Sequence, residues 1–245
     1  MLTVTSCLRD GINAFLRRFP LLMGAWIVIL GVQQLVDLLI PDLYALAELP
    51  IYVVLVAPLY AGQYLLSYKV VRGEAVTFRE FFRGFNRWGT LIGVSLITSL
   101  IVGIGMMLLV IPGIAWALMF AFAPIVVLDP WTPDGVPRRV GVFDALRTSR
   151  DLTKGYKGTL LGVAFILGLP TIAITVLLTI KAYNPGFPIS LWMLELLALL
   201  SGALFVGPIA STSYMVAYDR ITRLSRSTYD APTEAEANAG ERPTT

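Results

Sequence analysis

The chain has 245 residues, of which 56% are hydrophobic and only 14% charged, and it carries a formal net charge of +3. Its mean hydropathy is +0.74, whereas a soluble domain carries about 25% charged residues. This composition excludes an ordinary water-soluble domain and predicts that most of the chain lies in a lipid bilayer.

Six apolar segments follow one another along the chain, most of them close to the roughly 20 residues that cross a bilayer. They cover residues 20–40, 49–70, 90–111, 113–128, 159–180 and 190–214. The first follows a polar stretch and precedes no small-residue cleavage site, so we interpret it as a membrane span and not as a signal peptide. We expect a membrane domain over residues 1–226 and a disordered cytoplasmic tail over residues 227–245, which are polar.

The basic residues predict the orientation of these spans. If the six spans alternate in direction, 18 of the 19 Lys and Arg residues lie on the same side of the membrane as the N-terminus. Only Lys181 lies on the opposite side. Because basic loops stay in the cytoplasm, we expect both termini there, in a protein of the cell (inner) membrane. The outer loops are then short: residues 41–48, the corner Ile111-Pro112-Gly113, and residues 181–188.

An amphipathic stretch precedes each pair of spans on the cytoplasmic side. In the first stretch one apolar face contains Leu8, Ile12, Phe15, Leu16 and Phe19, and in the third it contains Val142, Phe143, Leu146, Ser149 and Leu152. In the second, Thr77 and Glu80 have the spacing of a capping box. We interpret these stretches as helices that lie in the headgroup layer. The alternative is a docking surface for a partner protein, formed in the second stretch by Phe78, Phe81, Phe82, Phe85, Arg79 and Arg83.

The chain contains an apparent internal repeat. Gly24, Gly93 and Gly162 begin similar segments and are 69 residues apart, and the second span of each pair carries a small residue followed by proline: Ala57-Pro58, Ala123-Pro124 and Gly207-Pro208. We infer repeats over residues 7–70, 77–130 and 142–220. The predicted fold is an all-α polytopic membrane bundle of six transmembrane helices, arranged as three hairpins that each follow a cytoplasmic amphipathic helix. The prolines mark packing kinks or a broken-helix substrate site.

Two groups of polar residues lie within the spans. One is expected near the outer headgroups, as an entry site for a proton or solute or as ordinary interfacial residues; it contains Gln33, Asp37, Lys181 and Glu195. The other is expected near the cytoplasmic side, as the lining of a cavity or as an interfacial aromatic belt; it contains Tyr60, Gln63, Tyr64, Ser67 and Tyr214.

The side chains that most enzymes use are scarce. There is no histidine, and Cys7 is the single cysteine. Ser-His and Cys-His nucleophile pairs are therefore excluded, together with most zinc sites. The sequence has neither a phosphate-binding loop nor a dinucleotide fingerprint. We predict that the chain is not an enzyme and holds no cofactor or metal.

A resemblance is carried by the motif Ile111-Pro112-Gly113, by Phe122-Ala123-Pro124 with Asp129, and by residues 143–155, which include Ala145-Leu146 and Ser149. The pattern resembles a superfamily of prokaryotic multi-pass proteins of unknown function, related to the membrane domain of some glycerophosphodiester phosphodiesterases. The resemblance implies a membrane fold and location but no reaction. In the fused proteins a soluble, histidine-dependent barrel performs hydrolysis, and this chain has no histidine.

These observations favour an integral membrane protein without catalytic machinery that organises the membrane or supports a partner. The alternative is a transporter or permease component for a small solute. The expected partners are the lipid bilayer, anionic lipid headgroups and a membrane or cytoplasmic protein, but not nucleic acid.

Overall fold

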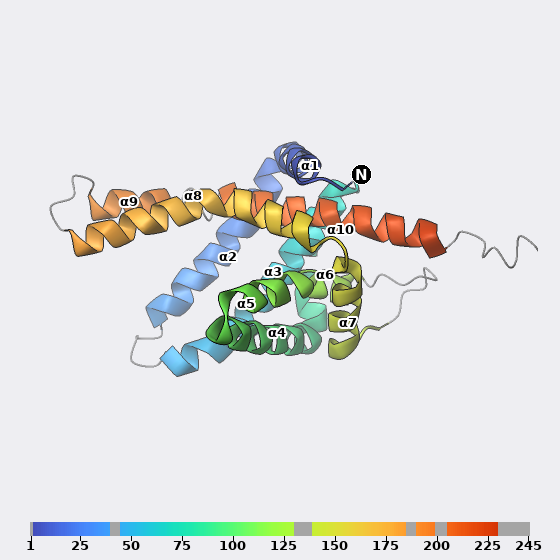
Figure 1. The fold of residues 1–245 in the computed structure, drawn as a ribbon, viewed down its shortest axis with the longest axis horizontal. Coiled ribbons are helices and arrows are strands. Elements are labelled where there is room, and N and C mark those ends of the chain that lie inside the picture. Colours follow the sequence, from blue (N-terminus) through green and yellow to red (C-terminus); the bar gives the residue numbers. More distant parts are fainter. Residues whose placement is uncertain (1, 40–44, 130–138, 185–189, 199–204, 230–245) are drawn as a thin grey trace, which may run out of the picture.

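The computed structural model describes residues 2–39, 45–129, 139–184, 190–198 and 205–229, and the regular elements in these ranges are all helices (Figure 1). The predicted all-α fold is therefore confirmed for this part of the chain. In chain order the elements are α1 (Val4–Arg17), α2 (Phe19–Leu39), α3 (Ala45–Val71), η2 (Phe78–Arg87), α4 (Trp88–Leu108), α5 (Val110–Met119), α6 (Ala123–Leu128), α7 (Val142–Thr153), α8 (Lys157–Tyr183), α9 (Leu191–Ala198) and α10 (Gly207–Tyr229).

Four helical stretches in the described ranges are long and apolar enough to cross a membrane. They are Phe19–Val36, Phe78–Leu108, Val110–Leu128 and Lys157–Tyr183. The C-terminal half of α8, with α9 beside it, extends beyond the other helices (Figure 1), and its large apolar side chains, such as Ile172 and Val176, are exposed. An apolar surface of this kind is the normal surface of a helix surrounded by lipid tails. The described residues thus have the character of a membrane protein.

Two of the six expected spans are not among these four. The expected span 49–70 lies within α3, and the expected span 190–214 is divided between α9 and α10, with residues 199–204 outside the described ranges. The expected fourth span is also two helices, since α5 ends at Met119 and α6 begins at Ala123. Helix α10 runs to Tyr229, past the expected domain end at residue 226, and the rest of the expected tail lies outside the described residues.

The corner between α4 and α5 is displaced from its expected position at Ile111-Pro112-Gly113. The backbone turns at Leu109, which is extended, with φ −160° and ψ 136°. Pro112 falls in the first turn of α5, where a missing N–H breaks no helical hydrogen bond. Gly113 allows α5 to approach α4 closely, because a Cβ there would lie 2.7 Å from the backbone nitrogen of Met106.

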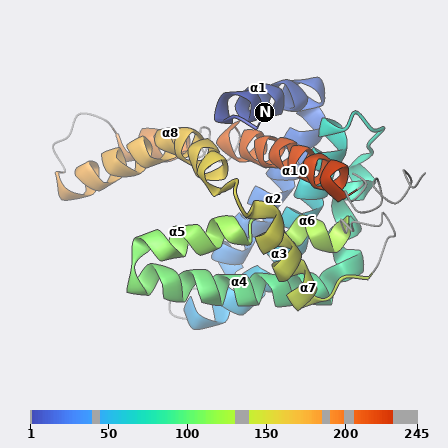
Figure 2. The ribbon, with the colours of Figure 1, turned by 45° about the vertical axis from the view of Figure 1, so that its right-hand side comes forward.

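Three short helices, α1, η2 and α7, precede the long helices α2, α4 and α8. Helix α7 lies beside α6 and the start of α4 (Figure 1), and α1 lies against α10 (Figure 2). Their packing partners are α10 for α1, α3 for η2 and α6 for α7. Each short helix therefore packs on a helix that carries one of the three pairs of a small residue and a proline, which are Ala57-Pro58, Ala123-Pro124 and Gly207-Pro208.

The packed faces of the three short helices combine small residues with a few large apolar ones, and other large apolar residues point away from the protein. Gly11 in α1, Gly84 in η2 and Ala145 in α7 are buried. The predicted apolar faces are thus only partly correct: Phe15, Leu146 and Leu152 are buried as expected, whereas other members of the predicted faces are exposed. The exposed large residues include Ile12, Leu16, Phe19, Phe78, Phe82, Phe85 and Phe143.

The second short helix differs in its winding. η2 is a 3₁₀ helix of 10 residues, whereas α1 has 14 residues and α7 has 12. At about 2.0 Å per residue, η2 is about 20 Å long, close to the roughly 21 Å and 18 Å of the two α-helices. The shorter sequence therefore covers the same distance across the ends of the long helices.

The same kind of contact occurs three times: a glycine in a long helix lies against the first residue of a short helix. A Cβ at Gly93 would lie 2.8 Å from a methyl group of Val142, and a Cβ at Gly162 would lie 2.7 Å from a methyl group of Val4. A Cβ at Gly24 would lie 3.6 Å from the ring of Phe78. In each case the contacting residue is the first residue of a short helix. The contact joins α2 to η2, α4 to α7, and α8 back to α1.

The main core lies where α3, α6 and α10 meet. The ring centroid of Tyr218 in α10 is 5.3 Å from that of Tyr68 in α3 and 5.3 Å from that of Phe122, which precedes α6. The Tyr218 hydroxyl donates a hydrogen bond of 3.3 Å to the carbonyl oxygen of Asp129. Edge-to-face rings of this kind fix the mutual orientation of the helices that carry them.

Candidate functional site

Helix η2 is held tightly on α3 by two glycines. A Cβ at Gly62 of α3 would overlap the carbonyl oxygen of Phe81, and a Cβ at Gly84 of η2 would overlap the carbonyl oxygen of Pro58. The Phe81 side chain is fully buried between the two helices. Phe81 therefore cannot belong to an exposed docking surface, and the predicted set is corrected in this respect.

The remaining phenylalanines of the predicted docking surface are exposed and touch one another. Phe82 is 45% exposed, and its ring centroid lies 5.9 Å from that of Phe78 and 6.4 Å from that of Phe85. Trp88, at the start of α4, is also exposed. These side chains form an outward aromatic row along η2, which would be unfavourable in water but is normal at a membrane interface.

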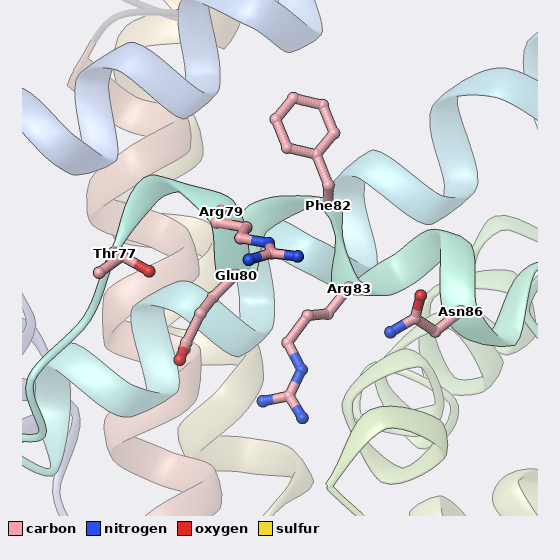
Figure 3. A pocket seen from close by; sticks show the side chains of 6 residues that line it. All are labelled: Thr77, Arg79, Glu80, Phe82, Arg83 and Asn86. Atoms are coloured by element: carbon pink, nitrogen blue, oxygen red, sulfur yellow. The ribbon is translucent and has the colours of Figure 1, made fainter.

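An open hollow of about 440 Å³ lies beside this row. Figure 3 shows that Phe82 projects to one side of η2 while Arg83 projects to the other, with the Asn86 side chain directed back toward Arg83. The hollow therefore has a polar lining beside an aromatic edge. It is lined by Thr77, Arg79, Glu80, Phe82, Arg83 and Asn86.

The charges in the hollow are unbalanced. Glu80 forms an ion pair of 2.7 Å with Lys69 of α3, which neutralises its carboxylate. Within the part of the chain that the structure describes, Arg79 and Arg83 form no ion pair with a carboxylate. The hollow is thus a positive site that lacks an internal counterion.

The capping box predicted for Thr77 and Glu80 is not formed. Thr77 occupies the N-cap position, but its side chain makes no capping hydrogen bond. The Glu80 carboxylate is occupied by Lys69 instead. A reciprocal capping pair is present elsewhere, between Thr3 and Ser6 at the start of α1.

The predicted inner polar group is divided by the structure. Gln63 and Ser67 are fully buried and contact Ser211 of α10. Ser211 donates to the carbonyl oxygen of Pro208 at 2.8 Å, so Ser67 is the donor in its 3.0 Å hydrogen bond with Ser211. Gln63 Nε2 donates to the same hydroxyl at 3.5 Å. These residues join α3 to α10.

The tyrosines of that group have separate environments. Tyr60 accepts a hydrogen bond of 3.1 Å from Gln33 Nε2, which links α3 to α2. Tyr214 donates to the carbonyl oxygen of Leu160 in α8 at 3.3 Å, and Tyr64 is partly buried against the main core. The structure thus connects Gln33, a member of the predicted outer group, to a member of the inner group.

The other members of the predicted outer group are less fully described. Lys181 lies in the last turn of α8 and is partly buried. The side chains of Asp37 and Glu195 lie outside the described residues. Whether the four predicted residues form one cluster is therefore left as a prediction.

Two backbone carbonyl groups beside the prolines have side-chain donors. Pro58 has no N–H for the carbonyl oxygen of Val54, and Trp88 Nε1 donates to that oxygen at 2.7 Å. At the break between α5 and α6, Ser149 Oγ donates to the carbonyl oxygen of Met119 at 2.8 Å and accepts from the Phe122 amide at 3.2 Å. The carbonyl oxygens of Val54 and Met119 therefore both have a hydrogen-bond donor from a neighbouring helix, without a ligand.

A second hollow, of about 320 Å³, lies where α1 meets α10. Arg220 forms an ion pair with Asp10 and donates to Ser6 Oγ at 2.6 Å. Asp219 is paired with Arg223 at 2.8 Å. The sequence analysis did not identify this site, because its two sides are about 200 residues apart. The hollow is lined by Asp10, Asn13, Ala14, Arg17, Val71, Val216, Asp219 and Arg220.

Cys7 is buried on α1 near this second hollow. Burial raises the pKa of the Cys7 thiol above its ordinary value, and the nearby Arg220 guanidinium offsets only part of this increase. The thiol is therefore protonated and unreactive at neutral pH. Across the described residues, no group of three or more His, Cys, Asp or Glu side chains is arranged to hold a metal ion.

Comparisons with known proteins identify no relative: no protein-family profile, curated protein or solved structure matches the chain.

Proposed function

We propose that the chain is an integral membrane protein without catalytic machinery that organises the lipids around it through its three short helices. One observation carries the proposal. On α1, η2 and α7 one face packs on the protein, whereas further large apolar residues such as Leu16, Phe82 and Phe143 are exposed outside that face. A helix with this arrangement is suited to the headgroup layer, with its large apolar side chains in the acyl boundary and its charged side chains in water.

The proposed architecture has six spans in three hairpins, with both termini in the cytoplasm. The glycine contacts Gly24–Phe78, Gly93–Val142 and Gly162–Val4 support a ring in which each repeat packs on the next and the third packs on the first. The spacing of the basic residues supports the orientation. A relation to the membrane domain of glycerophosphodiester phosphodiesterases, carried by residues 111–129 and 143–155, is part of the same proposal.

The second candidate function is a transporter or permease component. It is favoured by the buried polar contact between α3 and α10, where Gln63 Oε1 has no hydrogen-bond partner in the described part of the chain. An unsatisfied acceptor inside a bundle is costly unless water or a solute reaches it. Stabilisation of the purified protein by a small solute, lost in Gln63→Met, would favour this function over the first.

Fluorescence quenching tests the location of the short helices. In a Cys7→Ser background, Phe82→Cys is labelled with an environment-sensitive dye in vesicles of phosphatidylcholine, with Glu74→Cys in the preceding exposed loop as the control. We expect brominated acyl chains to quench the label at residue 82 and aqueous iodide to quench the label at residue 74. Equal quenching of both labels by iodide would overturn the proposal.

A second experiment tests the effect on lipids. The tagged protein is purified in native nanodiscs, and its lipids and co-purifying proteins are compared with those of Phe78→Ser/Phe82→Ser/Phe85→Ser. We expect the wild type to be enriched in anionic lipid relative to the bulk membrane and the variant to lose this enrichment. A lipid composition equal to that of the bulk membrane for both proteins would contradict a membrane-organising role.

A further inference from the structure

We propose that the hollow on η2 is a binding site for the phosphate group of an anionic phospholipid of the cytoplasmic leaflet. The inference rests on the proposed function, because it requires η2 to lie in the headgroup layer. It goes further in assigning one site and one ligand chemistry. The site consists of Arg79 and Arg83 with the polar side chains of Thr77 and Asn86.

Charge is the first argument for an anion. Arg79 and Arg83 line the same hollow and have no carboxylate partner within the described residues, while the nearby Glu80 carboxylate is held by Lys69 at 2.7 Å. Guanidinium groups bind phosphate through paired, charge-assisted hydrogen bonds. The Glu80–Lys69 ion pair removes the one carboxylate in the lining that would otherwise compete with a phosphate for the arginines.

The neutral lining residues suit the same ligand. The Thr77 hydroxyl and the Asn86 amide can both donate hydrogen bonds to a phosphate oxygen. In Figure 3 the Asn86 side chain is directed toward Arg83, and Thr77 lies at the opposite end of the hollow beyond Arg79. A phosphate bound at the centre would therefore find donors at both ends of the site.

The position of the aromatic row identifies the phosphate as that of a lipid. Phe82 projects to the opposite side of η2 from Arg83 (Figure 3), and Phe78, Phe85 and Trp88 are exposed with it. Aromatic side chains of this kind lie at the level of the headgroups. The arginines are then held at the depth of the lipid phosphates, whereas a site for a soluble anion would gain nothing from an aromatic edge.

The site is rigid before a ligand arrives. Phe81 is buried under η2 and its ring centroid lies 5.1 Å from that of Phe82, and the glycines Gly62 and Gly84 bring the two backbones into contact. The arginines are thus mounted on a fixed helix, which lowers the entropy lost when they bind.

Helix α7 provides a matched control. It carries two exposed arginines, Arg147 and Arg150, at comparable spacing, but Asp144 and Asp151 lie on the same helix. In the described contacts these two carboxylates are not paired with a basic residue, whereas the one carboxylate in the hollow on η2 is paired with Lys69. Removing two positive charges from either helix changes the net charge of the protein equally, so a difference between the variants reports the site and not general electrostatics.

The experiment is native mass spectrometry of the full chain released from nanodiscs of phosphatidylcholine with a minor fraction of phosphatidylglycerol. Wild type, Arg79→Gln/Arg83→Gln and Arg147→Gln/Arg150→Gln are compared. We expect wild type and the α7 variant to retain phosphatidylglycerol and the η2 variant to retain it with on the order of tenfold lower occupancy. Unchanged helix content and unfolding temperature in phosphatidylcholine alone would show that each variant is folded.

Three results would overturn the site. The first is an equal loss of bound phosphatidylglycerol in the two double variants, and the second is no loss of bound phosphatidylglycerol in the η2 variant. The third is displacement of the bound lipid by millimolar inorganic phosphate, which would assign the site to a soluble anion. None of these results depends on the quenching of a label at residue 82, which tests the location of η2 alone. Failure of the site and failure of the proposed function are therefore distinguishable.

Discussion

The indole Nε1 of Trp88 donates a hydrogen bond of 2.7 Å to the carbonyl oxygen of Val54. Val54 precedes Pro58 by four residues, so its carbonyl oxygen is the one that the proline leaves without a helical donor. The first residue of α4 thus completes the hydrogen bonding of α3 and ties the two helices together.

Replacing Trp88 with Phe keeps most of the ring and removes the donor. We expect Trp88→Phe to lower the free energy of unfolding by about 1 kcal/mol, because the Val54 carbonyl loses its partner. In a Pro58→Ala background the new amide at residue 58 supplies a helical donor, so the same change should have a much smaller effect. A double-mutant cycle measured by reversible unfolding in mixed micelles tests this. Equal effects in both backgrounds would contradict the assignment.

The interlocked glycines predict a position-specific effect of a single methyl group. Gly62→Ala and Gly84→Ala each place a Cβ against a backbone carbonyl oxygen, and we expect each to destabilise the protein by about 1–3 kcal/mol. Gly31→Ala and Gly103→Ala are the controls, since no atom lies within 4 Å of a Cβ at either position. The controls should be neutral or stabilising by up to about 1 kcal/mol. Thermal unfolding in detergent distinguishes the two pairs.

The buried Cys7 thiol predicts slow alkylation in the folded protein. Burial raises its pKa above the ordinary value, so less thiolate is present at any given pH near neutrality, and the side chain is not exposed. We expect maleimide to react slowly at neutral pH, faster as the pH rises, and at once after denaturation. A rate in the folded protein equal to that of the denatured chain would show that α1 does not pack as described.

The contacts of Arg220 predict a looser first helix when they are removed. Arg220→Gln loses the ion pair with Asp10 that joins α10 to α1. We expect Cys7 in this variant to be alkylated several times faster while the helix content is unchanged. Arg223→Gln is the control, because Arg223 pairs with Asp219 within α10 and does not touch α1 in the described contacts. Equal rates in the two variants would exclude a role of Arg220 in holding α1.

The contact between Gln63 and Ser211 predicts that an apolar residue of similar shape is tolerated. Gln63 Nε2 has one long hydrogen bond of 3.5 Å and its Oε1 has none, so little is lost in Gln63→Met. We expect the free energy of unfolding to change by less than about 1 kcal/mol, whereas Gln63→Ala should cost about 2–4 kcal/mol by leaving a cavity. A large loss in Gln63→Met would indicate an internal water or solute bound at this position.

Helix positions followed well from the spacing of apolar residues, but the contacts between helices did not. Hydrophobic periodicity identified α1 as amphipathic and placed Phe15 on its apolar face, where Phe15 is buried with Gly11, but it also placed Leu16 there, which is exposed. Periodicity ranks residues by size and hydrophobicity, whereas a close helix crossing requires small side chains. The sequence argument therefore identified most of the packed face of α7, through Leu146, Ser149 and Leu152, but not the small residues at the contacts.

The candidate site was predictable in its residue types but not in its geometry. The alternation of Phe and Arg over residues 78–85 indicated an interfacial helix. The burial of Phe81 was missed because the stretch winds as a 3₁₀ helix, in which residues three apart share a face. The role of Lys69 as the partner of Glu80, and that of Ser211 as the partner of Ser67, depend on how separate helices meet, which no local pattern encodes.

The packing of α1 on α10 has a consequence for the order of assembly. The partners of α1 include Ser213, against which Gly11 is buried, and Arg220. Both are synthesised about 200 residues after α1 itself. Helix α1 is therefore synthesised long before its partners on α10, and the packing of Gly11 and Asp10 described here can form only after α10 has been made.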